Sequence, residues 1–214
     1  PNGAGKTTTF YMMIGLARPD AGRVLLDGED ITREPMYIRA RKGVNYLAQE
    51  PSVFQKLTVS ENHLAILEGL KVPRREMRER TDHLLEELNI GHLADRKASK
   101  LAGGERRRLE ITRALITEPE LLVLDESVSA LDVSVQAQIL NLLNDLKREL
   151  RLSYIFISHD LAVVKYMSDR IIVMKEGKFE ETGIADEIYH NPSSEYTRKL
   201  IHAVPGYQNS SGSS

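Results

Sequence analysis

Residues 2–8 of the chain, NGAGKTT, combine residue types that could bind a polyphosphate. Gly3 and Gly5 have no Cβ, so their backbone N–H groups can turn toward a phosphate. Lys6 would add a positive charge at the β and γ phosphates, and Thr7 a hydroxyl for Mg²⁺. The predicted binding stretch comprises Asn2, Gly3, Ala4, Gly5, Lys6, Thr7 and Thr8. A glycine turn that merely precedes a helix is the alternative.

Two adjacent carboxylates follow a strongly apolar run in LLVLDE at 121–126. Asp125 would orient Mg²⁺ through water, and Glu126 would accept a proton from an attacking water. The same pair could also be a strand end that meets solvent. Because the glycine loop precedes this strand in the chain, the sequence favours a site that hydrolyses a nucleotide.

The elements that must position these residues alternate between strands and helices. Apolar runs predict buried strands at 121–125 and 153–158, and further strands at 24–26, 44–47 and 170–177, with a turn at 27–30. Helices are predicted at 8–17, through most of 60–116, and at 161–167, 184–189 and 195–203. Another helix has the apolar stripe Val135, Ile139, Leu142, Leu143, Leu146 and Leu150. This order is typical of an α/β protein with a parallel sheet.

Composition limits the remaining possibilities. The chain has 214 residues, 41% of them hydrophobic, which fits one globular domain. Its net charge of -2 provides no basic field, so no nucleic-acid partner is expected. The lack of cysteine excludes disulfides, thiolate catalysis and cysteine-bound metals. The apolar runs are too short for a membrane-spanning helix, and the small polar residues at 207–214 predict a flexible tail.

Four further stretches resemble motifs of the ATP-binding-cassette (ABC) ATPase family. LAGGERRR at 101–108 is similar to the family's signature, SALD at 129–132 to its D-loop, and ISHD at 157–160 to the segment with its switch histidine. Gln49 in YLAQEP matches the Q-loop. The resemblance covers residues 1 to about 205. It implies an α/β P-loop NTPase fold, with an ABC ATPase domain at 1–206 that contains a parallel-sheet core and a helical subdomain at about 56–112.

The resemblance also implies roles in the hydrolysis of ATP with Mg²⁺. The catalytic residues would be Glu126, His159 and Gln49, and the residues that serve the metal would be Thr7, Gln49 and Asp125. His159 would bond the γ-phosphate and keep Glu126 and the water aligned. A structural role is the alternative for this histidine.

Other residues would face the opposite subunit of a pair. The start of the signature would meet the γ-phosphate of an ATP held by that subunit, or would simply begin a helix. Its residues are Ala102, Gly103, Gly104 and Glu105. Asp132 would cap a helix that starts near Val133 and would also contact the partner's phosphate loop. Capping alone would be a sufficient explanation for this aspartate.

The chain departs from the family pattern in two ways. The signature has a serine where this chain has Ala102, and one bond to a charged group is worth about 1.5 to 3 kcal/mol. Weaker closure and slower hydrolysis are therefore expected. In the family, a further glycine, an interior strand and an aromatic residue precede the loop. The start therefore resembles a truncation, and this chain alone is expected to be unstable or nearly inactive.

The resemblance divides between two subfamilies. The first half, through GGERRRLEI, is similar to lipopolysaccharide-exporter ATPases, and the second half, from Asp125 onward, to ATPases of oligopeptide and dipeptide importers. The change falls between Thr112 and Asp125. The chain therefore has the character of a hybrid, natural or artificial.

Together these features predict the ATP-hydrolysing subunit of a bacterial ABC transporter, peripheral on the cytoplasmic face of the inner membrane. It would pair head-to-tail with a second ABC ATPase subunit and bind transmembrane permease subunits. Lipopolysaccharide export is favoured over peptide import, because permease contacts are expected around Gln49 and the helical stretch, in the exporter-like half. Two alternatives stay open: an ATP-binding module without effective hydrolysis, and a soluble ABC-type switch ATPase.

Overall fold

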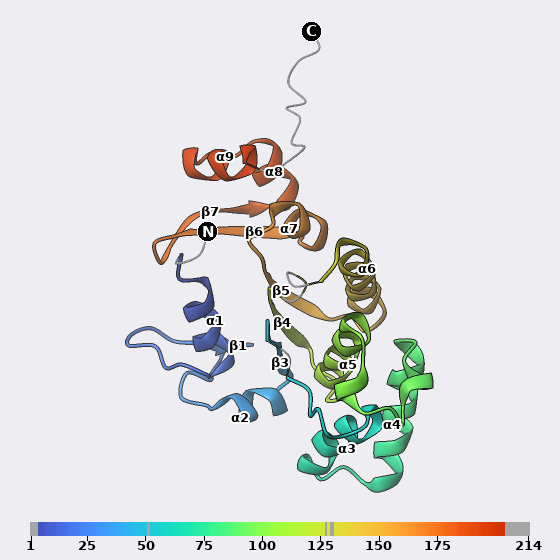
Figure 1. Ribbon diagram of the computed structural model, residues 1–214. Helices are drawn as coiled ribbons and strands as arrows, with labels where there is room; N and C mark the ends of the chain where they lie inside the picture. Colours follow the sequence, from blue (N-terminus) through green and yellow to red (C-terminus); the bar gives the residue numbers. More distant parts are fainter. Residues whose placement is uncertain (1–3, 51, 127, 129–130, 204–214) are drawn as a thin grey trace. The chain divides into compact units, whose positions relative to one another are not determined.

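The structure, a computed structural model, describes residues 4–50, 52–126, 128 and 131–203. These residues form two compact units (Figure 1). The central unit is Tyr11–Ile155, and the terminal unit combines the described residues up to Phe10 with those from Phe156 onward. The predicted tail at 207–214 lies outside the described residues.

A parallel sheet forms the core of the central unit. Its strand order is β3 (Val44–Leu47), β4 (Leu121–Asp125) and β5 (Ser153–Ile157). β3 and β4 pair in parallel with Val44 opposite Leu121, which confirms the predicted parallel arrangement. Leu122, Val123 and Leu124 are fully buried, as expected for a strand covered on both faces. Because the strands are parallel, the segments that follow β3 and β4 emerge at the same edge of the sheet.

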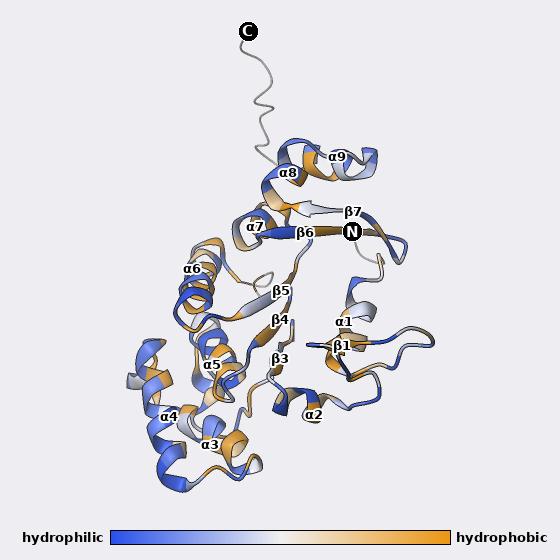
Figure 2. Ribbon diagram, turned by 180° about the vertical axis from the view of Figure 1, so that it is seen from behind, coloured by the Kyte–Doolittle hydropathy of each residue, from blue (hydrophilic) through white to orange (hydrophobic). Residues whose placement is uncertain are grey.

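Two long helices lie beside this sheet, α5 (Gly103–Leu115) and α6 (Val133–Glu149) (Figure 1). The apolar stripe of α6 buries Ile139, Leu140, Leu143 and Leu146. The prediction placed Leu150 in that stripe, but this residue is the C-cap of α6 and is 41% exposed. In the hydropathy colouring, β4 is mainly orange (hydrophobic) and α4 is mainly blue (hydrophilic) (Figure 2).

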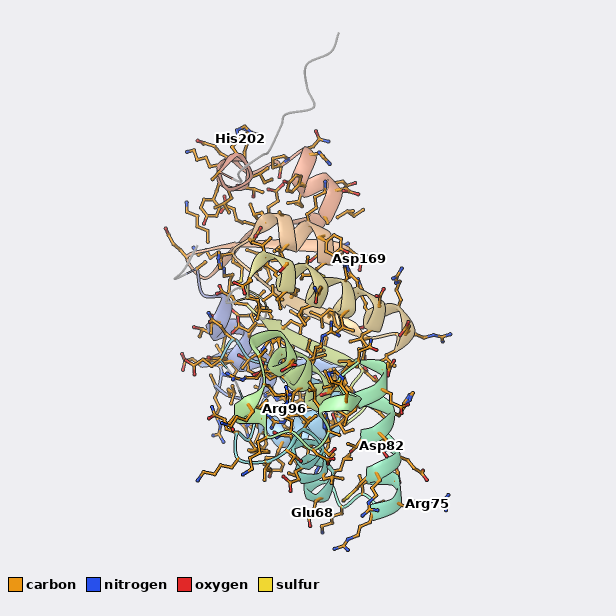
Figure 3. The ribbon with its side chains drawn as sticks, turned by 45° about the vertical axis from the view of Figure 1, so that its right-hand side comes forward. Glu68, Arg75, Asp82, Arg96, Asp169 and His202 are labelled. Atoms are coloured by element: carbon orange, nitrogen blue, oxygen red, sulfur yellow. The ribbon has the colours of Figure 1, made fainter. Side chains whose placement is uncertain are left out.

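The stretch predicted to be mostly helical at 60–116 consists of several separate helices. They are α3 (Val59–Gly69), α4 (Arg74–Glu87), the 3₁₀ turns η1 (Gly91–Leu93) and η2 (Ala98–Lys100), and α5. Lys71 and Asn89 adopt left-handed backbone angles, which end α3 and α4. α3 begins with a capping box in which Thr58 and Glu61 bond each other's backbone N–H. α4 carries a charged outer face, with Arg75 and Asp82 labelled along it in Figure 3.

The helix predicted at 8–17 is α1 (Lys6–Ile14), which ends three residues earlier than expected. Gly15 follows with φ of 84°, and the N–H of Leu16 donates to the carbonyl of Tyr11 at 2.8 Å. This is a Schellman-type ending, in which a glycine takes the left-handed conformation that stops the helix. A Cβ on Gly15 would lie 2.9 Å from the carbonyl oxygen of Glu34, so the site also requires glycine for space.

A hairpin and a short helix follow α1. The predicted turn at 27–30 contains Asp27 and Gly28, both with positive φ, between β1 (Leu25–Leu26) and β2 (Glu29–Asp30). Asp-Gly suits the two-residue turn of a twisted hairpin. Sequence reasoning missed β2 and α2 (Met36–Arg41), because both are too short for a clear periodic signal.

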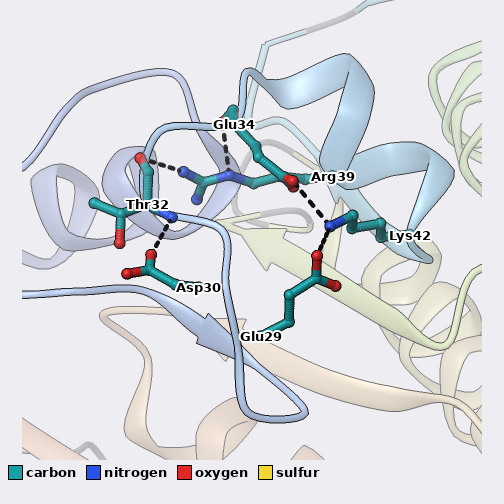
Figure 4. A network of polar contacts seen from close by, with 6 residues as sticks. All are labelled: Glu29, Asp30, Thr32, Glu34, Arg39 and Lys42. Carbon is teal, nitrogen blue, oxygen red and sulfur yellow. Dashed lines mark hydrogen bonds and ion pairs between the residues drawn. The ribbon is translucent and has the colours of Figure 1, made fainter.

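Arg39 of α2 ties these segments together and is only 1% exposed. Its guanidinium donates to the carbonyls of Met12 at 2.7 Å and Met13 at 2.6 Å. It also donates to the carbonyls of Thr32 and Glu34 (Figure 4). The last carbonyls of α1 have no partner within the helix, so a buried cation satisfies them where the helix dipole is negative.

The terminal unit is built on an antiparallel hairpin, β6 (Arg170–Lys175) and β7 (Lys178–Ile184). Glu176 and Gly177, both with positive φ, form its turn. The prediction had a single strand at 170–177 and missed β7. α7 (Leu161–Met167), α8 (Ala185–His190) and α9 (Glu195–His202) complete the unit, close to their predicted bounds. Its buried core is Ile171, Val173, Ala185 and Ile188.

Across the part of the chain that the structure describes, no helix combines the length and the apolar character that crossing a bilayer requires.

Candidate functional site

The two carboxylates predicted after β4 differ in their surroundings. Asp125 is the last residue of the strand and is 4% exposed. Glu126 is half-buried and has a φ of 39°, in the left-handed region that a residue with a Cβ rarely adopts. Such a conformation costs about 1–3 kcal/mol and is common at functional sites, where it aims a side chain.

Gln49 and Glu126 lie together at the edge of the sheet. The Gln49 amide Nε2 donates to Glu126 Oε2 at 3.3 Å. The two residues are far apart in sequence, and they meet because β3 and β4 end side by side. Sequence reasoning assigned both residues to one catalytic centre, and the structure gives them this contact.

Tyr46 is a further residue of this edge that sequence reasoning missed. Its hydroxyl donates to Asp125 Oδ2 at 3.2 Å. Burial, together with the negative charge of Asp125, raises the pKa of Tyr46, so the phenol keeps its proton and stays a donor. The available signal was a polar hydroxyl within the buried strand β3.

The glycine loop is packed against the β6–β7 turn in the terminal unit. The buried Ala4 accepts a hydrogen bond at its carbonyl from the N–H of Gly177, at 3.0 Å. Gly5 has a φ of 87°, and a Cβ there would lie 3.1 Å from Gly177 Cα. Only glycine fits this close approach comfortably. Asn2 and Gly3 lie outside the described residues.

The residues after Gly5 open α1. Lys6 is the first residue of the helix and is half-buried, while Thr7 and Thr8 are exposed in its first turn. Thr9, which sequence reasoning did not single out, donates its hydroxyl to the Gly5 carbonyl at 3.0 Å. The first backbone N–H groups of an α-helix have no carbonyl partner within the helix, so those of α1 can donate to a bound anion.

The signature residues begin α5, as predicted. Ala102 is the N-cap, and its N–H donates to the Glu105 carboxylate at 2.8 Å. This is half of a capping box, because alanine has no oxygen to accept the N–H of Glu105. Gly103 and Gly104 form the first turn, and a Cβ on Gly104 would lie 3.0 Å from Val135 Cγ1 of α6.

The predicted cap by Asp132 is wrong. Asp132 occupies the N-cap position of α6, which begins at Val133, but its side chain makes no capping hydrogen bond. The residue is exposed, so water can hydrate its carboxylate instead. The preceding D-loop positions 129 and 130 lie outside the described residues.

His159 is exposed and stands between β5 and α7 in the terminal unit. The next residue, Asp160, caps α7 by accepting the N–H groups of Ala162 and Val163. This cap fixes the backbone beside His159. The histidine is thus at a strand end, the position expected of a residue that reaches a ligand.

The residues predicted to serve Mg²⁺ have suitable donor atoms. The described residues contain no cluster of three or more histidine, cysteine or acidic side chains that could hold a metal by themselves. The Thr7 hydroxyl, the Gln49 amide oxygen and the Asp125 carboxylate are all oxygen donors. This set fits Mg²⁺, which binds few protein ligands and takes the remainder from water and substrate phosphates.

Comparison with known proteins identifies relatives across most of the chain. A profile of the ABC transporter family matches residues 1–129. The lipopolysaccharide export system ATP-binding protein LptB of Haemophilus influenzae is 42% identical over 192 residues, covering 89% of this chain and 79% of that protein. An ATP-binding protein of Brucella ovis named for peptide import is 40% identical over 215 residues, covering 95% of this chain and 66% of that protein.

Solved structures agree with these relatives. The ADP conformation of MJ1267, an ATP-binding cassette of an ABC transporter, has a TM-score of 0.81 and 28% identity, and covers 95% of this chain and 85% of that one. CbiO1 from Clostridium perfringens, part of the ABC transporter complex cbiONQ, has a TM-score of 0.81 and 30% identity, covering 96% and 82%. Both the predicted fold class and the predicted resemblance, with its two kinds of relative, are confirmed. The chain therefore belongs to the ABC transporter family and is an ATP-binding, ATP-hydrolysing subunit of that family.

Proposed function

We propose that Glu126 is the general base for attack of water on the γ-phosphate of ATP, with Gln49 as its orienting partner. The observation that carries this proposal is the contact between Gln49 Nε2 and Glu126 Oε2 at 3.3 Å. The amide nitrogen restrains the carboxylate, and the amide oxygen is left to serve the metal. The positive φ of Glu126 supports the same role, because such backbone strain is common at functional sites.

The remaining roles in this proposal are those that the family resemblance implies. Lys6 and the first turn of α1 bind the phosphates, and Lys6 stabilises the charge that develops on them. Mg²⁺, when bound by Thr7, Gln49 and Asp125, would neutralise charge on the phosphates. His159 holds the γ-phosphate from the end of β5. The N–H groups of Gly103 and Gly104 meet an ATP that belongs to a second copy or a related subunit, in a head-to-tail pair.

We further propose that the subunit works with transmembrane permease subunits at the cytoplasmic face of the inner membrane. Lipopolysaccharide export is the favoured process. The expected contact surface, around Gln49 and α3 to α4, lies in the half of the chain that resembles the exporter ATPases, and LptB of Haemophilus influenzae is 42% identical. Peptide import is the second candidate, supported by the resemblance of the later half and by the Brucella ovis relative.

Substitution Glu126→Gln tests the chemical assignment. It should abolish phosphate release but preserve ATP binding and ATP-driven pairing, because the amide keeps the shape of the carboxylate and cannot accept the proton. Phosphate release and ATP-dependent dimerisation are measured in parallel on the full-length protein. Retained turnover would contradict the assignment. Identifying the permease that co-purifies with the full-length protein separates export from import.

A further inference from the structure

The segment that carries Gln49 is bonded to the helix that carries the signature. Arg107 of α5 donates from Nη1 to the carbonyl oxygen of Ala48 at 3.1 Å. Ala48 is the residue immediately before Gln49. Arg107 itself lies less than one helical turn beyond the signature residue Glu105.

Two more hydrogen bonds join α5 to the stretch of chain around Gln49. Asn45 of β3 donates to the carbonyl of Ala114 at the end of α5, at 2.5 Å. Arg113 of α5 donates to the carbonyl of Ser52 at 2.5 Å, and its guanidinium lies 4.6 Å from the centre of the Phe54 ring. Residues of α5 therefore hold the chain on both sides of Gln49.

Arg107 is buried in a way that stability alone does not explain. Its side chain is 6% exposed, and it pairs with Glu110, 3% exposed, at 2.5 Å. Nε and Nη2 of Arg107 and Oε1 of Glu110 are buried without a hydrogen-bond partner among the described residues. A buried ion pair is often no more stabilising than well-packed apolar side chains, and unsatisfied polar atoms make it less so.

We propose that Arg107 is a positioning residue for hydrolysis: by holding the Ala48 carbonyl, it sets the reach of Gln49 to Glu126 and couples α5 to the catalytic carboxylate. This inference rests on the proposed role of Glu126. Three contacts fix the end of β3, namely Tyr46 to Asp125, Arg107 to Ala48 and Gln49 to Glu126. Without the hydrogen bond from Arg107 to the Ala48 carbonyl, the backbone that carries Gln49 can shift.

The same contact gives a route by which a partner subunit can act on the site. ATP bound against Gly103 and Gly104 would displace or lock the start of α5. Because Arg107 belongs to the same helix, that change reaches Gln49 through one side chain and one carbonyl. Formation of the head-to-tail pair of subunits would then align Gln49 with the general base Glu126.

The test uses Mg²⁺-ATP turnover by the full-length protein with its membrane partner. In the double variant Arg107→Met with Glu110→Leu, both buried charges are removed together, so that neither is left unpaired. We expect kcat to fall about tenfold to a hundredfold, since a small misplacement of a catalytic group has effects of that size. KM for ATP should stay within about twofold, because Lys6 and its loop bind the phosphates.

Arg108→Met is the matched control. Arg108 is the next residue of α5 and donates to the backbone carbonyl of Leu88 at 3.0 Å, so it makes a bond of the same kind that does not involve the Gln49 segment. Its kcat should stay near that of the unaltered protein. Equal losses of kcat in this variant and in the Arg107→Met, Glu110→Leu variant would show a merely structural role and overturn the inference.

A double-mutant cycle with Gln49→Ala separates this inference from the proposed function. If Arg107 acts through Gln49, its removal should cause no further loss of kcat in the Gln49→Ala background. A full additional loss would overturn the inference and leave the proposed function standing. Unchanged turnover in both Gln49→Ala and Glu126→Gln would instead overturn the proposed function, and the inference with it.

Discussion

Ala102, at the N-cap of α5, lacks the hydroxyl that a serine would provide there. Ala102→Ser would complete the capping box with Glu105, which should raise the free energy of unfolding by about 1 kcal/mol. In the proposed head-to-tail pair, the same hydroxyl would bond the γ-phosphate and raise the ATPase rate. Thermal unfolding and phosphate release measure the two effects. Ala102→Gly is the control, since glycine is a tolerated N-cap without an oxygen, and an unchanged rate in Ala102→Ser would contradict the proposal.

Individual site residues could be predicted from sequence where they follow a recognisable apolar strand. Glu126 follows a buried strand directly, and Gln49 follows the shorter strand 44–47, so parallel pairing was enough to bring them to one edge. Tyr46, Arg107 and Gly177 were missed. Their contacts join residues 79, 59 and 173 positions apart, and no short-range spacing indicates which partner such a residue meets.

At the scale of elements, the ending of α1 depends on a residue in another helix. Arg39→Met should lower the free energy of unfolding by about 3 kcal/mol or more, because the partly buried carbonyls of Met12 and Met13 would lose their buried, charged donor. Arg39→Lys should recover only part of it, since an ammonium cannot reach four carbonyls as a planar guanidinium does. Urea unfolding measures both. Lys42→Met, in the same network but partly exposed, is the control and should have a much smaller effect. Equal losses for Arg39 and Lys42 would contradict this account.

The strands at 44–47 and 121–125 were predicted with their observed bounds, because each is a short apolar run between clear breaks. The errors occurred where conformation decides the boundary. Gly15 ends α1 through its positive φ, although the apolar spacing continues beyond it. The sequence pattern does not reveal β7, because most of its residues are polar and exposed. The turn at Glu176 and Gly177 also lies inside the stretch 170–177 that the apolar run predicts as one strand.

At the scale of the whole molecule, family and fold were accessible from sequence while the transported substrate was not. The residues assigned to ATP are the ones whose chemistry fixes their type and spacing, so they identify the family from this chain alone. The relatives at 42% and 40% identity carry names for lipopolysaccharide export and for peptide import, so the resemblance does not select one substrate. In the proposed function, the choice between these two processes depends on the surface that would meet the permease.

Stability of the molecule should depend on pH through His63 of α3. This residue is fully buried, with Nδ1 3.0 Å from the Val59 carbonyl and Nε2 without a partner among the described residues. Burial lowers the pKa of His63 to about 4, only partly opposed by the Val59 bond. Since the unfolded pKa is about 6.5, the folded form binds fewer protons below that value, and stability is lost as the pH falls from about 6.5 toward 4. The loss should reach about 2 kcal/mol between pH 7.5 and pH 5, measured by urea unfolding. His63→Leu should flatten the dependence of the unfolding free energy on pH. His83→Gln, at an exposed histidine of α4, is the control and should leave that dependence unchanged. If the unfolding free energy of His63→Leu falls with pH as steeply as that of the unaltered protein, the assignment to His63 is refuted.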